Sequence, residues 1–495
     1  MRPSFSIPSQ LWYLFSLALL LWSSGPSKGQ SLPSPLDQVS AGAYHAAALD
    51  TTGSIWLWGR NNAGQVGDGS IIDRFRPTRL PAPSGVAGTR WSAVVAGTFH
   101  SAAIGSDGSL WTWGDNTNGQ LGDGTTTPHL RPVQVPPPAT AAPGTRWAYV
   151  ALGANHTLAL RSDGTLWAWG ANYWGQLGDN SGVMQSRPVQ IPAPTGAQGA
   201  YWTRVVTSED HTLGLTSDGS LWGWGRDQRA QLGLGTLTYV RSFPTLAFRA
   251  PRSPTQSWVE LATGEAFSLA LRSDGILFAC GANDSGQLGG SVTPTGFASL
   301  PVVVPPPVGA AAGSSWTHIS ARGAHAVAQR SDKSVWSWGE NYDGELGINS
   351  TNNPIAPTQE FTGRQWDLAA AGNTFTLAVT VVSLFATGNN DFGQFGDGTT
   401  NGSLVFRSTA GPLAIRAVKP HNNIRLWPNP AADILHIGGI SATARVRVFD
   451  MAGRLVMAPS RGTVDLSVIG LAKGVYIVET QEMNAPSLSS RLLIE

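Results

Sequence analysis

The sequence predicts an all-β protein, in which a seven-bladed β-propeller is followed by a small Ig-like β-sandwich. Three observations support this fold class. A motif rich in tryptophan and glycine returns seven times along the chain. Most copies also hold an Asp-Gly turn signal between two apolar runs, and the pattern stops near residue 410, where a different kind of segment begins. Regular return of one β unit indicates a repeat architecture, and the change near residue 410 indicates a second domain.

The repeat is clearest in residues 110–122, which read Leu-Trp-Thr-Trp-Gly-Asp-Asn-Thr-Asn-Gly-Gln-Leu-Gly. A Gly-Gln-Leu-Gly element, or a close variant, starts eight residues after the first aromatic residue of each copy, and Ala230 replaces its first glycine in the fourth copy. That aromatic residue recurs every 49 to 58 residues, at Trp56, Trp111, Trp167, Trp222, Phe278, Trp336 and Phe385.

Four strands are expected in each repeat, as the second copy illustrates. Residues 94–97 form a short strand ending in Ala-Gly, and residues 99–104 form a second strand that contains His100. Asp107-Gly108 then predicts a hairpin turn into a third strand over residues 110–114. A glycine-rich loop leads to a last extended piece that ends in Arg-Pro-Val.

Both faces of the Trp-x-Trp strand are apolar. Side chains alternate along a strand, so Trp56 and Trp58 point to one face while Leu57 fills the other. Both faces must therefore be covered by neighbouring sheets, and a ring of sheets does this without leaving bare ends. How the ring closes is open: residues 404–417 could pair with the first repeat near Val39, or could lead directly into a linker.

These motifs resemble the regulator-of-chromosome-condensation repeat family over about residues 36–412. The matching pieces are Gly-x-x-His-x-x-Ala-Leu, Asp-Gly-x-Leu-Trp-x-Trp-Gly and Asn-x-x-Gly-Gln-Leu-Gly. The resemblance implies a seven-bladed propeller, in agreement with the seven copies. Eukaryotic relatives act as nucleotide exchange factors that use an inserted wedge and acidic loop residues, but the distances between successive repeats leave no room for such a wedge here.

Composition and the N-terminus suggest an exported protein without a nucleic-acid partner. The net charge is +1 and there are only four lysines, so no basic tract could hold a polyanion. An apolar run over residues 11–22 is short and is followed by small residues, which predicts a signal peptide over residues 1–29 that is cleaved near Gly29. A retained membrane anchor is the alternative, and after cleavage we expect no membrane span.

The C-terminal part predicts a separate β module. We expect the propeller over residues 30–416, a linker over 417–424 and the second domain over 425–495. This tail resembles the C-terminal sorting domain of type IX secretion substrates, found among Bacteroidetes, and an ordinary Ig-like accessory domain is the alternative. The positions that carry the resemblance are Pro428, Asn429, Pro430, Gly453, Gly474 and Tyr476. The resemblance implies export by the type IX machinery.

Three constellations could carry chemistry but are better explained by structure. Five histidines lie one repeat apart, too far to converge on a metal, so each is expected to be buried and bonded to neighbouring backbone. Acidic loops such as Gly122-Asp123-Gly124 lack the spacing of a calcium loop and fit turns. The only cysteine, Cys280, is expected to be a buried apolar residue. The histidines are His45, His100, His156, His211 and His325.

No catalytic motif is evident. Ser208-Glu209-Asp210-His211 holds nucleophile, acid and base types, but neighbours on a strand point to opposite faces. There is no Gly-x-Ser-x-Gly elbow, His-Glu-x-x-His pair or phosphate loop before a helix. We therefore predict no catalytic residues, no cofactor and no bound metal.

The most informative variation lies between the Trp-x-Trp strand and the Gly-Gln-Leu-Gly element. The second loop position is always Asn or Asp, which a structural turn requires, whereas neighbouring positions vary freely. Variable tips on a repeated scaffold predict a binding surface, although unselected drift is the alternative. The candidate binding residues are Tyr173, Trp174, Arg226, Arg229, Tyr342, Asp343, Asp391 and Phe392.

The sequence therefore predicts a secreted or surface-displayed, monomeric propeller that binds an extracellular protein or glycan without catalysis. Two alternatives stay open. The first is a regulator similar to the eukaryotic nucleotide exchange factors, which would act inside the cell. The second is an enzyme inhibitor or a glycan-active enzyme, which would need a converging carboxylate pair or a compact aromatic patch on one face.

Overall fold

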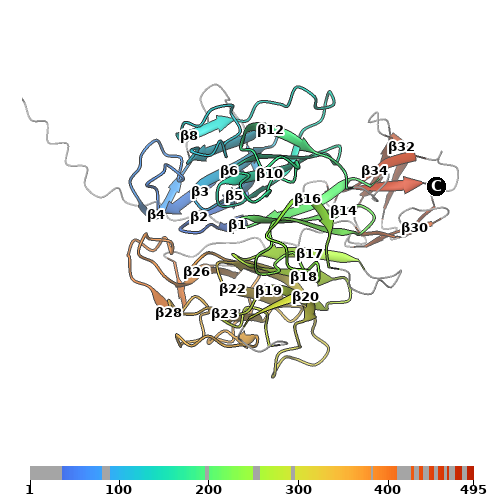
Figure 1. Cartoon of the computed structure of the whole chain (residues 1–495). Coiled ribbons are helices and arrows are strands. Elements are labelled where there is room, and N and C mark those ends of the chain that lie inside the picture. Colours follow the sequence, from blue (N-terminus) through green and yellow to red (C-terminus); the bar gives the residue numbers. More distant parts are fainter. Residues whose placement is uncertain are drawn as a thin grey trace, which may run out of the picture.

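The computed structural model describes residues 36–80, 90–194, 200–248, 257–290, 296–380 and 383–409, and seven strands between residues 425 and 494. Seven four-stranded antiparallel sheets, here called blades, follow one another along the first 409 residues. Each blade consists of four strands that are consecutive in the sequence, as expected from the repeats. The blades surround a common centre, so the predicted all-β, seven-bladed propeller is confirmed (Figure 1).

The first strand of each blade lies at the centre of the ring, because it contacts the first strands of both neighbouring blades. These inner strands are β1 (Leu36–Ala41), β5 (Trp91–Ala96), β9 (Trp147–Leu152), β13 (Trp202–Thr207), β17 (Trp258–Thr263), β21 (Trp316–Arg322) and β25 (Leu368–Ala371).

The second and third strands form the buried middle of each blade. The second strands are β2 (His45–Asp50), β6 (His100–Gly105), β10 (His156–Arg161), β14 (His211–Thr216), β18 (Phe267–Arg272), β22 (His325–Arg330) and β26 (Phe375–Thr380). The third strands carry the Trp-x-Trp motif and are β3 (Ile55–Gly59), β7 (Leu110–Gly114), β11 (Leu166–Gly170), β15 (Leu221–Arg226), β19 (Leu277–Ala282), β23 (Val335–Gly339) and β27 (Ser383–Gly388).

The fourth strands form the rim, and many of their residues are exposed. They are β4 (Arg74–Arg79), β8 (His129–Gln134), β12 (Gln185–Ile191), β16 (Val240–Leu246), β20 (Phe297–Val303), β24 (Thr358–Gln359) and β28 (Ser403–Ser408). In this order of strands, the loops from first to second strand and from third to fourth strand emerge at one end of the blades. We call this end the loop face.

Neighbouring blades pack through the two apolar faces of the Trp-x-Trp strand, as the alternation predicts. Trp56 and Trp58 pack against the seventh blade, whereas Leu57 packs on the other side against Trp91 and Trp113 of the second blade. A fully buried indole of this kind contributes on the order of 4–6 kcal/mol before conformational entropy is subtracted. Every blade is therefore stabilised mainly by its two neighbours.

The ring closes by side-chain packing and individual hydrogen bonds, one of them from the Gly398 amide to the Phe75 carbonyl, and not by a shared strand. Among the described strands, β28 pairs only with β27 and β1 pairs only with β2, so residues 403–408 do not join the first blade. The seam is instead filled by Trp58, Phe375 and Phe395, and the indole Nε1 of Trp58 donates a hydrogen bond of 2.7 Å to the carbonyl of Gln394. The first and seventh blades are neighbours in Figure 1.

The C-terminal strands make ladders only with one another. They are β29 (Arg425–Trp427), β30 (Ile434–Gly438), β31 (Arg445–Asp450), β32 (Leu455–Arg461), β33 (Asp465–Ser467), β34 (Gly474–Gln481) and β35 (Leu488–Ile494). They form a three-stranded and a four-stranded sheet, in the orders β29-β30-β33 and β32-β31-β34-β35. The tail is thus a β module whose strands do not enter the propeller, and its Ig-like sandwich packing stays a prediction.

Several predicted features lie outside the described residues. These are the signal peptide over residues 1–29, the linker over 417–424, and the positions Pro428, Asn429, Pro430 and Gly453. Gly474 and Tyr476 lie in β34. Within the described part of the chain, no helix has the length and apolar character that a membrane span requires.

Candidate binding face

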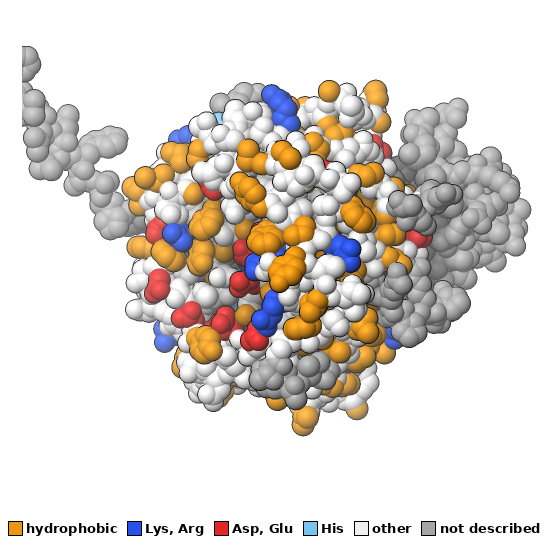
Figure 2. Space-filling model, viewed as in Figure 1, with side chains coloured by type: hydrophobic (Ala, Val, Ile, Leu, Met, Phe, Trp, Pro, Cys, Tyr) orange, Lys and Arg blue, Asp and Glu red, His pale blue; other side chains and the backbone are white. Residues whose placement is uncertain are grey.

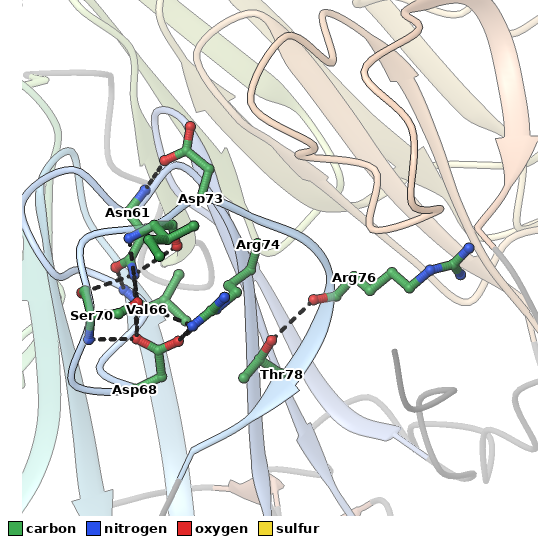
Figure 3. Close-up of polar contacts among 9 residues, drawn as sticks. Asn61, Val66, Asp68, Ser70, Asp73, Arg74, Arg76 and Thr78 are labelled. Atoms are coloured by element: carbon green, nitrogen blue, oxygen red, sulfur yellow. Dashed lines mark hydrogen bonds and ion pairs between the residues drawn. The ribbon is translucent and has the colours of Figure 1, made fainter. Parts of the chain in front are cut away.

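The loops between third and fourth strands are organised by the asparagine at their second position. In the first blade the Asn61 side-chain amide donates hydrogen bonds of 3.0 Å to the carbonyls of Ser70 and Ile72, and its Oδ1 accepts one of 2.8 Å from the Val66 amide (Figure 3). Asp68 accepts bonds from Ser70 and from the Arg74 guanidinium in the same loop. One asparagine therefore shapes about ten residues of loop.

The same bond recurs in all other blades, which confirms the structural role expected for this position. In each case the side-chain oxygen of Asn or Asp accepts a hydrogen bond from the backbone amide five residues later. The acceptors are Asn116, Asp227, Asn172, Asn283, Asn341 and Asn390. Residues at the third and fourth loop positions take no part in this bond, so their side chains are free to differ between blades.

The Gly-Gln-Leu-Gly element ties each loop to the next blade. The backbone carbonyl of Gln120 accepts a hydrogen bond of 2.9 Å from the Trp169 indole, and its side-chain oxygen accepts one from the Asn118 amide. Gly122 has a φ of 74°, and a Cβ there would lie 2.5 Å from the Trp169 Nε1. Glycine is required at this position because the indole of the next blade needs that space.

Five buried histidines form latches between blades. His45 Nε2 lies 2.8 Å from the Ser101 hydroxyl of the next blade, and that hydroxyl donates to the carbonyl of Gln65 in the first blade. The expected burial is confirmed, but the Nε2 partner is a hydroxyl and not backbone. His100, His156, His211 and His325 bond in the same way to a serine or threonine of the next blade.

The latch places a proton on Nε2, and burial keeps the histidine neutral. Because the Ser101 hydroxyl donates its proton to a carbonyl, its oxygen accepts one from His45 Nε2. Burial lowers the pKa of His45 to about 3. Within the described residues, no group of three or more His, Cys, Asp or Glu side chains is arranged to hold a metal ion.

The Ser208-Glu209-Asp210-His211 quartet is not assembled for nucleophilic attack. The Ser208 hydroxyl is buried and bonds to no other described residue, whereas His211 Nε2 lies 2.9 Å from the hydroxyl of Ser268. Asp210 lies 3.8 Å from Arg226 instead. The acidic loop residue Asp123 accepts bonds from Asn116, Thr125 and His129 of its own loop, as its turn role predicts.

The structure places the eight candidate binding residues at the tips of the loop face. Tyr173 is 71% exposed and Tyr342 is 70% exposed. Asp343 and Asp391 are also exposed, whereas the remaining four are half-buried, namely Trp174, Arg226, Arg229 and Phe392. Their contacts divide several of them into small groups: Trp174 stacks on Arg226, Arg229 pairs with Asp284, and Phe392 lies beside Arg60.

Two of these groups contain an arginine that already has a partner. The Arg226 guanidinium stacks 5.0 Å from the Trp174 ring and bonds to the Gln228 side chain. Arg229 forms an ion pair with Asp284 of the next blade. Their guanidinium charges are balanced by Asp210 and Asp284, so these groups contribute shape more than net charge.

A third group was missed from the sequence. The Arg60 guanidinium lies 4.8 Å from the Phe392 ring centroid, 5.2 Å from that of Tyr44 and 5.5 Å from that of Phe99. These rings come from the seventh, first and second blades, and all four side chains are half-buried. We call this group the Arg60 cluster.

A signal for the Arg60 cluster does exist in the repeats. Tyr44 and Phe99 directly precede the aligned histidines, and Arg60 directly follows the glycine of Trp-x-Trp-Gly. The Arg60 amide donates a hydrogen bond of 3.0 Å to the Tyr44 carbonyl. The two repeat positions are thus neighbours in every blade, and comparing them across blades would have placed aromatic residues beside the arginine.

Acidic residues gather on another part of the loop face, over the fourth to sixth blades. Burial raises the pKa of Glu209, Asp210 and Glu340, and the nearby Glu265 carboxylate raises each of them further. On the side of the molecule drawn in Figure 2, acidic side chains also gather toward the lower left, whereas hydrophobic ones are scattered. The charges of the surface are few and mixed, in agreement with the net charge of +1.

An arginine closes the centre of the loop face. Arg322, at the end of the inner strand of the sixth blade, is buried and donates a hydrogen bond of 2.9 Å to the Thr98 hydroxyl of the second blade. Its side chain therefore reaches across the middle of the ring. The negative charge of Glu209 partly offsets the burial of this cation.

Family models agree with this architecture. The RCC1-like domain model matches residues 138–433, and the regulator of chromosome condensation (RCC1) repeat model matches residues 52–104 and 107–160. A second RCC1 repeat model matches residues 37–65 and 91–120. The chain belongs to the RCC1 family.

RCC1-family relatives carry diverse names. The ultraviolet-B receptor UVR8 of Arabidopsis thaliana is 31% identical over 73% of this chain and 78% of its own length. A Caenorhabditis elegans homolog of the X-linked retinitis pigmentosa GTPase regulator is 27% identical over 75% of this chain, but only 25% of that relative is matched. The human E3 ubiquitin-protein ligase HERC2 is 31% identical over 52% of this chain and 5% of its own length.

Solved structures of the RCC1 family share the fold. Yeast RCC1 (Prp20), solved bound to Kap60, superposes with a TM-score of 0.61 at 21% identity, covering 86% of this chain and 94% of that one. Human WBSCR16 has a TM-score of 0.60 at 22% identity, covering 69% of this chain and 85% of that one. At these identities the likeness concerns the fold alone.

This RCC1-family chain also carries an export signal at its end. A model of the secretion system C-terminal sorting domain matches residues 425–495. The match confirms the resemblance to type IX sorting tails. Such a tail indicates type IX export to the cell surface or beyond.

Proposed function

We propose that this RCC1-family propeller is a non-catalytic scaffold that binds an extracellular protein or glycan through its loop face, after export directed by its sorting domain. The observation that carries this proposal is the contrast within each loop. The Asn or Asp at the second position makes the same bond in every blade, whereas the exposed residue after it changes, for example from Asn62 to Tyr173 and Asp391. A constant frame with variable tips is the usual construction of a binding surface.

The proposed absence of catalysis is supported by how the polar groups of the face are used. The buried histidines are held as latches, and Ser208 does not contact His211. The named relatives include a receptor and a GTPase regulator homolog, and HERC2, a ligase, is matched over only 5% of its length. The tail supports action outside the cell, where an intracellular GTPase is absent.

The proposal is tested by ligand capture with the exported full-length chain. Replacing Tyr173, Trp174 and Tyr342 together by serine removes exposed tips without touching the Asn-centred bonds, so partner capture from cell-surface material should fall at least tenfold. The matched control replaces Val308 and Phe361 by serine, because these exposed residues lie toward the other end of the blades.

Location is tested separately. Surface protease should degrade the protein on intact cells, or the protein should occur in the medium. A protein that stays protected inside intact cells, or a triple loop variant that captures the same partners as the control variant, would contradict the proposal.

A further inference from the structure

We infer that the Arg60 cluster binds a terminal acidic sugar of an extracellular glycan, with its carboxylate on the Arg60 guanidinium and its ring on the surrounding aromatic side chains. The inference deepens the proposed scaffold function and rests on it. The site lies where the seventh, first and second blades meet, and its ligand is an acidic sugar.

The first step is the state of the guanidinium. Among the residues that the structure describes, no carboxylate lies within ion-pair distance of Arg60, and no hydrogen bond leaves its side chain. Arg226 and Arg229, on the same face, both have acidic neighbours. Of these three arginines, only Arg60 has a charge that no described carboxylate balances and side-chain N–H groups that donate to no described acceptor.

The second step is that the cation is held in place. Three aromatic rings lie within 4.8 to 5.5 Å of its Cζ, and Tyr44 contacts both Phe99 and Phe392 at ring distances of 6.1 and 5.9 Å. Stacking on aromatic faces restricts the flexible arginine side chain before any ligand arrives. Less entropy is then lost when a carboxylate binds, and a planar fork can hold that carboxylate through two parallel hydrogen bonds.

The third step concerns the ligand class. Peptides are recognised by free sheet edges, apolar helix grooves, proline-binding aromatic grooves, clusters of several arginines, or backbone nests that capture a chain terminus. The Arg60 cluster offers a single cation among rings, on a face made of loops. A sugar carboxylate needs one guanidinium, and the apolar C–H face of the sugar ring packs well against aromatic rings.

The fourth step restricts the length of the ligand. Glu209, Asp210, Glu265 and Glu340 lie over the fourth and fifth blades and the start of the sixth-blade loop, and a long polyanion that crossed the face would meet them. A glycan with a single acidic sugar at its end would place its charge at the Arg60 cluster and only neutral sugars over the rest of the face. The distribution of charge therefore favours a glycan end over a polyanionic chain.

The experiment measures binding of the full-length chain to oligosaccharides that end in glucuronic acid. Otherwise identical oligosaccharides that end in glucose are the comparison. We expect at least tenfold tighter binding of the acid-ended form, weakened by salt. Arg60→Gln should abolish the preference, and Arg60→Lys should retain only part of it because an ammonium cannot form the fork. Arg79→Gln, on the outer strand of the same blade, is the matched control and should bind like the unaltered chain.

The outcomes separate this inference from the scaffold proposal. Equal binding of acid-ended and glucose-ended sugars, or an unchanged preference in a folded Arg60→Gln variant, overturns the Arg60 inference. The scaffold proposal would survive such a failure of the Arg60 inference if the triple loop variant at Tyr173, Trp174 and Tyr342 still captured fewer cell-surface partners than its control. Unfolding temperatures of all variants, measured alongside, exclude misfolding as the cause.

Discussion

Single residues in the loops reveal where this propeller departs from its own repeat. Glu345 stands where six blades have glutamine, and it is buried. In the second blade the equivalent Gln120 donates a hydrogen bond of 2.8 Å to Asp115, but an ionised glutamate cannot donate. Burial, together with the charges of Asp343 and Glu340, raises the pKa of Glu345 to about 7.

Glu345→Gln should make the protein more stable at high pH. The folded protein holds the Glu345 proton more tightly than the unfolded chain, so this stability is fully present below about pH 4.5 and is lost as pH rises through about 7. A shift of this size corresponds to at most about 3 kcal/mol. Urea unfolding at pH 5 and pH 8.5 should therefore show a gain for the variant mainly at pH 8.5.

The reciprocal variant is the control. Gln120→Glu, beside Asp115, should acquire a loss of stability at high pH that the unaltered chain lacks in this blade. An equal effect of Glu345→Gln at both pH values would show that the carboxyl does not titrate in this range.

Ala230 is a second departure at residue scale. It occupies the position of the first glycine of the element in the fourth blade with a φ of 59°, a region unfavourable for residues with a Cβ. Ala230→Gly should therefore raise the free energy of unfolding by about 1 kcal/mol, as measured by urea denaturation. Gly64→Ala, at the same position of the first blade, should lower it, because its Cβ would lie 2.4 Å from Leu130 Cδ2. A destabilised Ala230→Gly variant would argue against backbone strain at this site.

At the scale of elements, the histidine latches couple neighbouring blades to pH. Four of the five histidines have pKa values lowered to about 3, and His325 has one of about 4. Each stays neutral when folded but takes up a proton near pH 6.5 when unfolded. This stability is present above pH 6.5 and is lost as pH falls, by up to about 2 kcal/mol per histidine at pH 5.

His100→Phe should remove the contribution of one histidine to the loss of stability at low pH. The fifth and seventh blades already have phenylalanine at this position, namely Phe267 and Phe375, so the blade core can accommodate the ring. At pH 7.5 the variant should lose roughly 0.5–1.5 kcal/mol, because the Thr157 oxygen loses the bond from His100 while its hydroxyl still donates to the Gln120 carbonyl. Between pH 7.5 and 5, however, its urea midpoint should fall less than that of the unaltered chain, and an equal fall would contradict the buried neutral state.

The tryptophan latches allow a direct comparison of seams. Trp58→Phe removes the hydrogen bond to Gln394 at the closing seam, and Trp169→Phe removes the equivalent bond to Gln120 at an internal seam. Trp58→Phe should cost roughly 1–3 kcal/mol because the Gln394 carbonyl loses its donor, and Trp169→Phe should cost less because the Gln120 carbonyl still accepts a bond from Thr157. Only Trp58→Phe should also speed proteolysis at the first and seventh blades, because these two blades are the ends of the repeat array and are not joined by consecutive strands of the chain. Equal proteolysis patterns would indicate an additional closing element.

At the scale of the whole molecule, the tail and the propeller should be separable. The described tail strands pair only with one another, so deletion of residues 425–495 should leave the unfolding temperature of the propeller unchanged within about 2 °C. The same deletion should abolish export, because the deleted part is the matched sorting domain. Calorimetry of the purified proteins and immunoblotting of cell fractions check the two effects, and a destabilised propeller would mean that the tail contributes to its core.

The repeats predicted most of the fold because each determinant is local and occurs seven times. Alternation in Trp56-Leu57-Trp58 was enough to predict that both faces of this strand pack against neighbouring blades. Asp107-Gly108 was enough to predict a hairpin. The mode of closure could not be predicted, since it depends on contacts between the two ends of the ring. The prediction of a backbone partner for His45 Nε2 was wrong, because Ser101 lies 56 residues away and becomes a neighbour only when blades pack.

The candidate site was predicted only in part. The loop tips lie on one face as expected, but Arg60 was passed over because no single repeat shows that Tyr44, Phe99 and Phe392 surround it. Such a cluster combines three blades and two kinds of loop. It requires the curvature of the ring, which no local pattern contains.

Closure without a shared strand has an evolutionary consequence. At six of the seven junctions in the described ring, a tryptophan or Cys280 donates to a backbone carbonyl of the preceding blade. Between the sixth and seventh blades the Thr387 hydroxyl donates to the Gly344 carbonyl, so no blade is specialised for closure. A gene that duplicated or lost one unit in frame would keep compatible edges at the new junction. The architecture can therefore vary by whole modules, with point mutations then adapting individual loops.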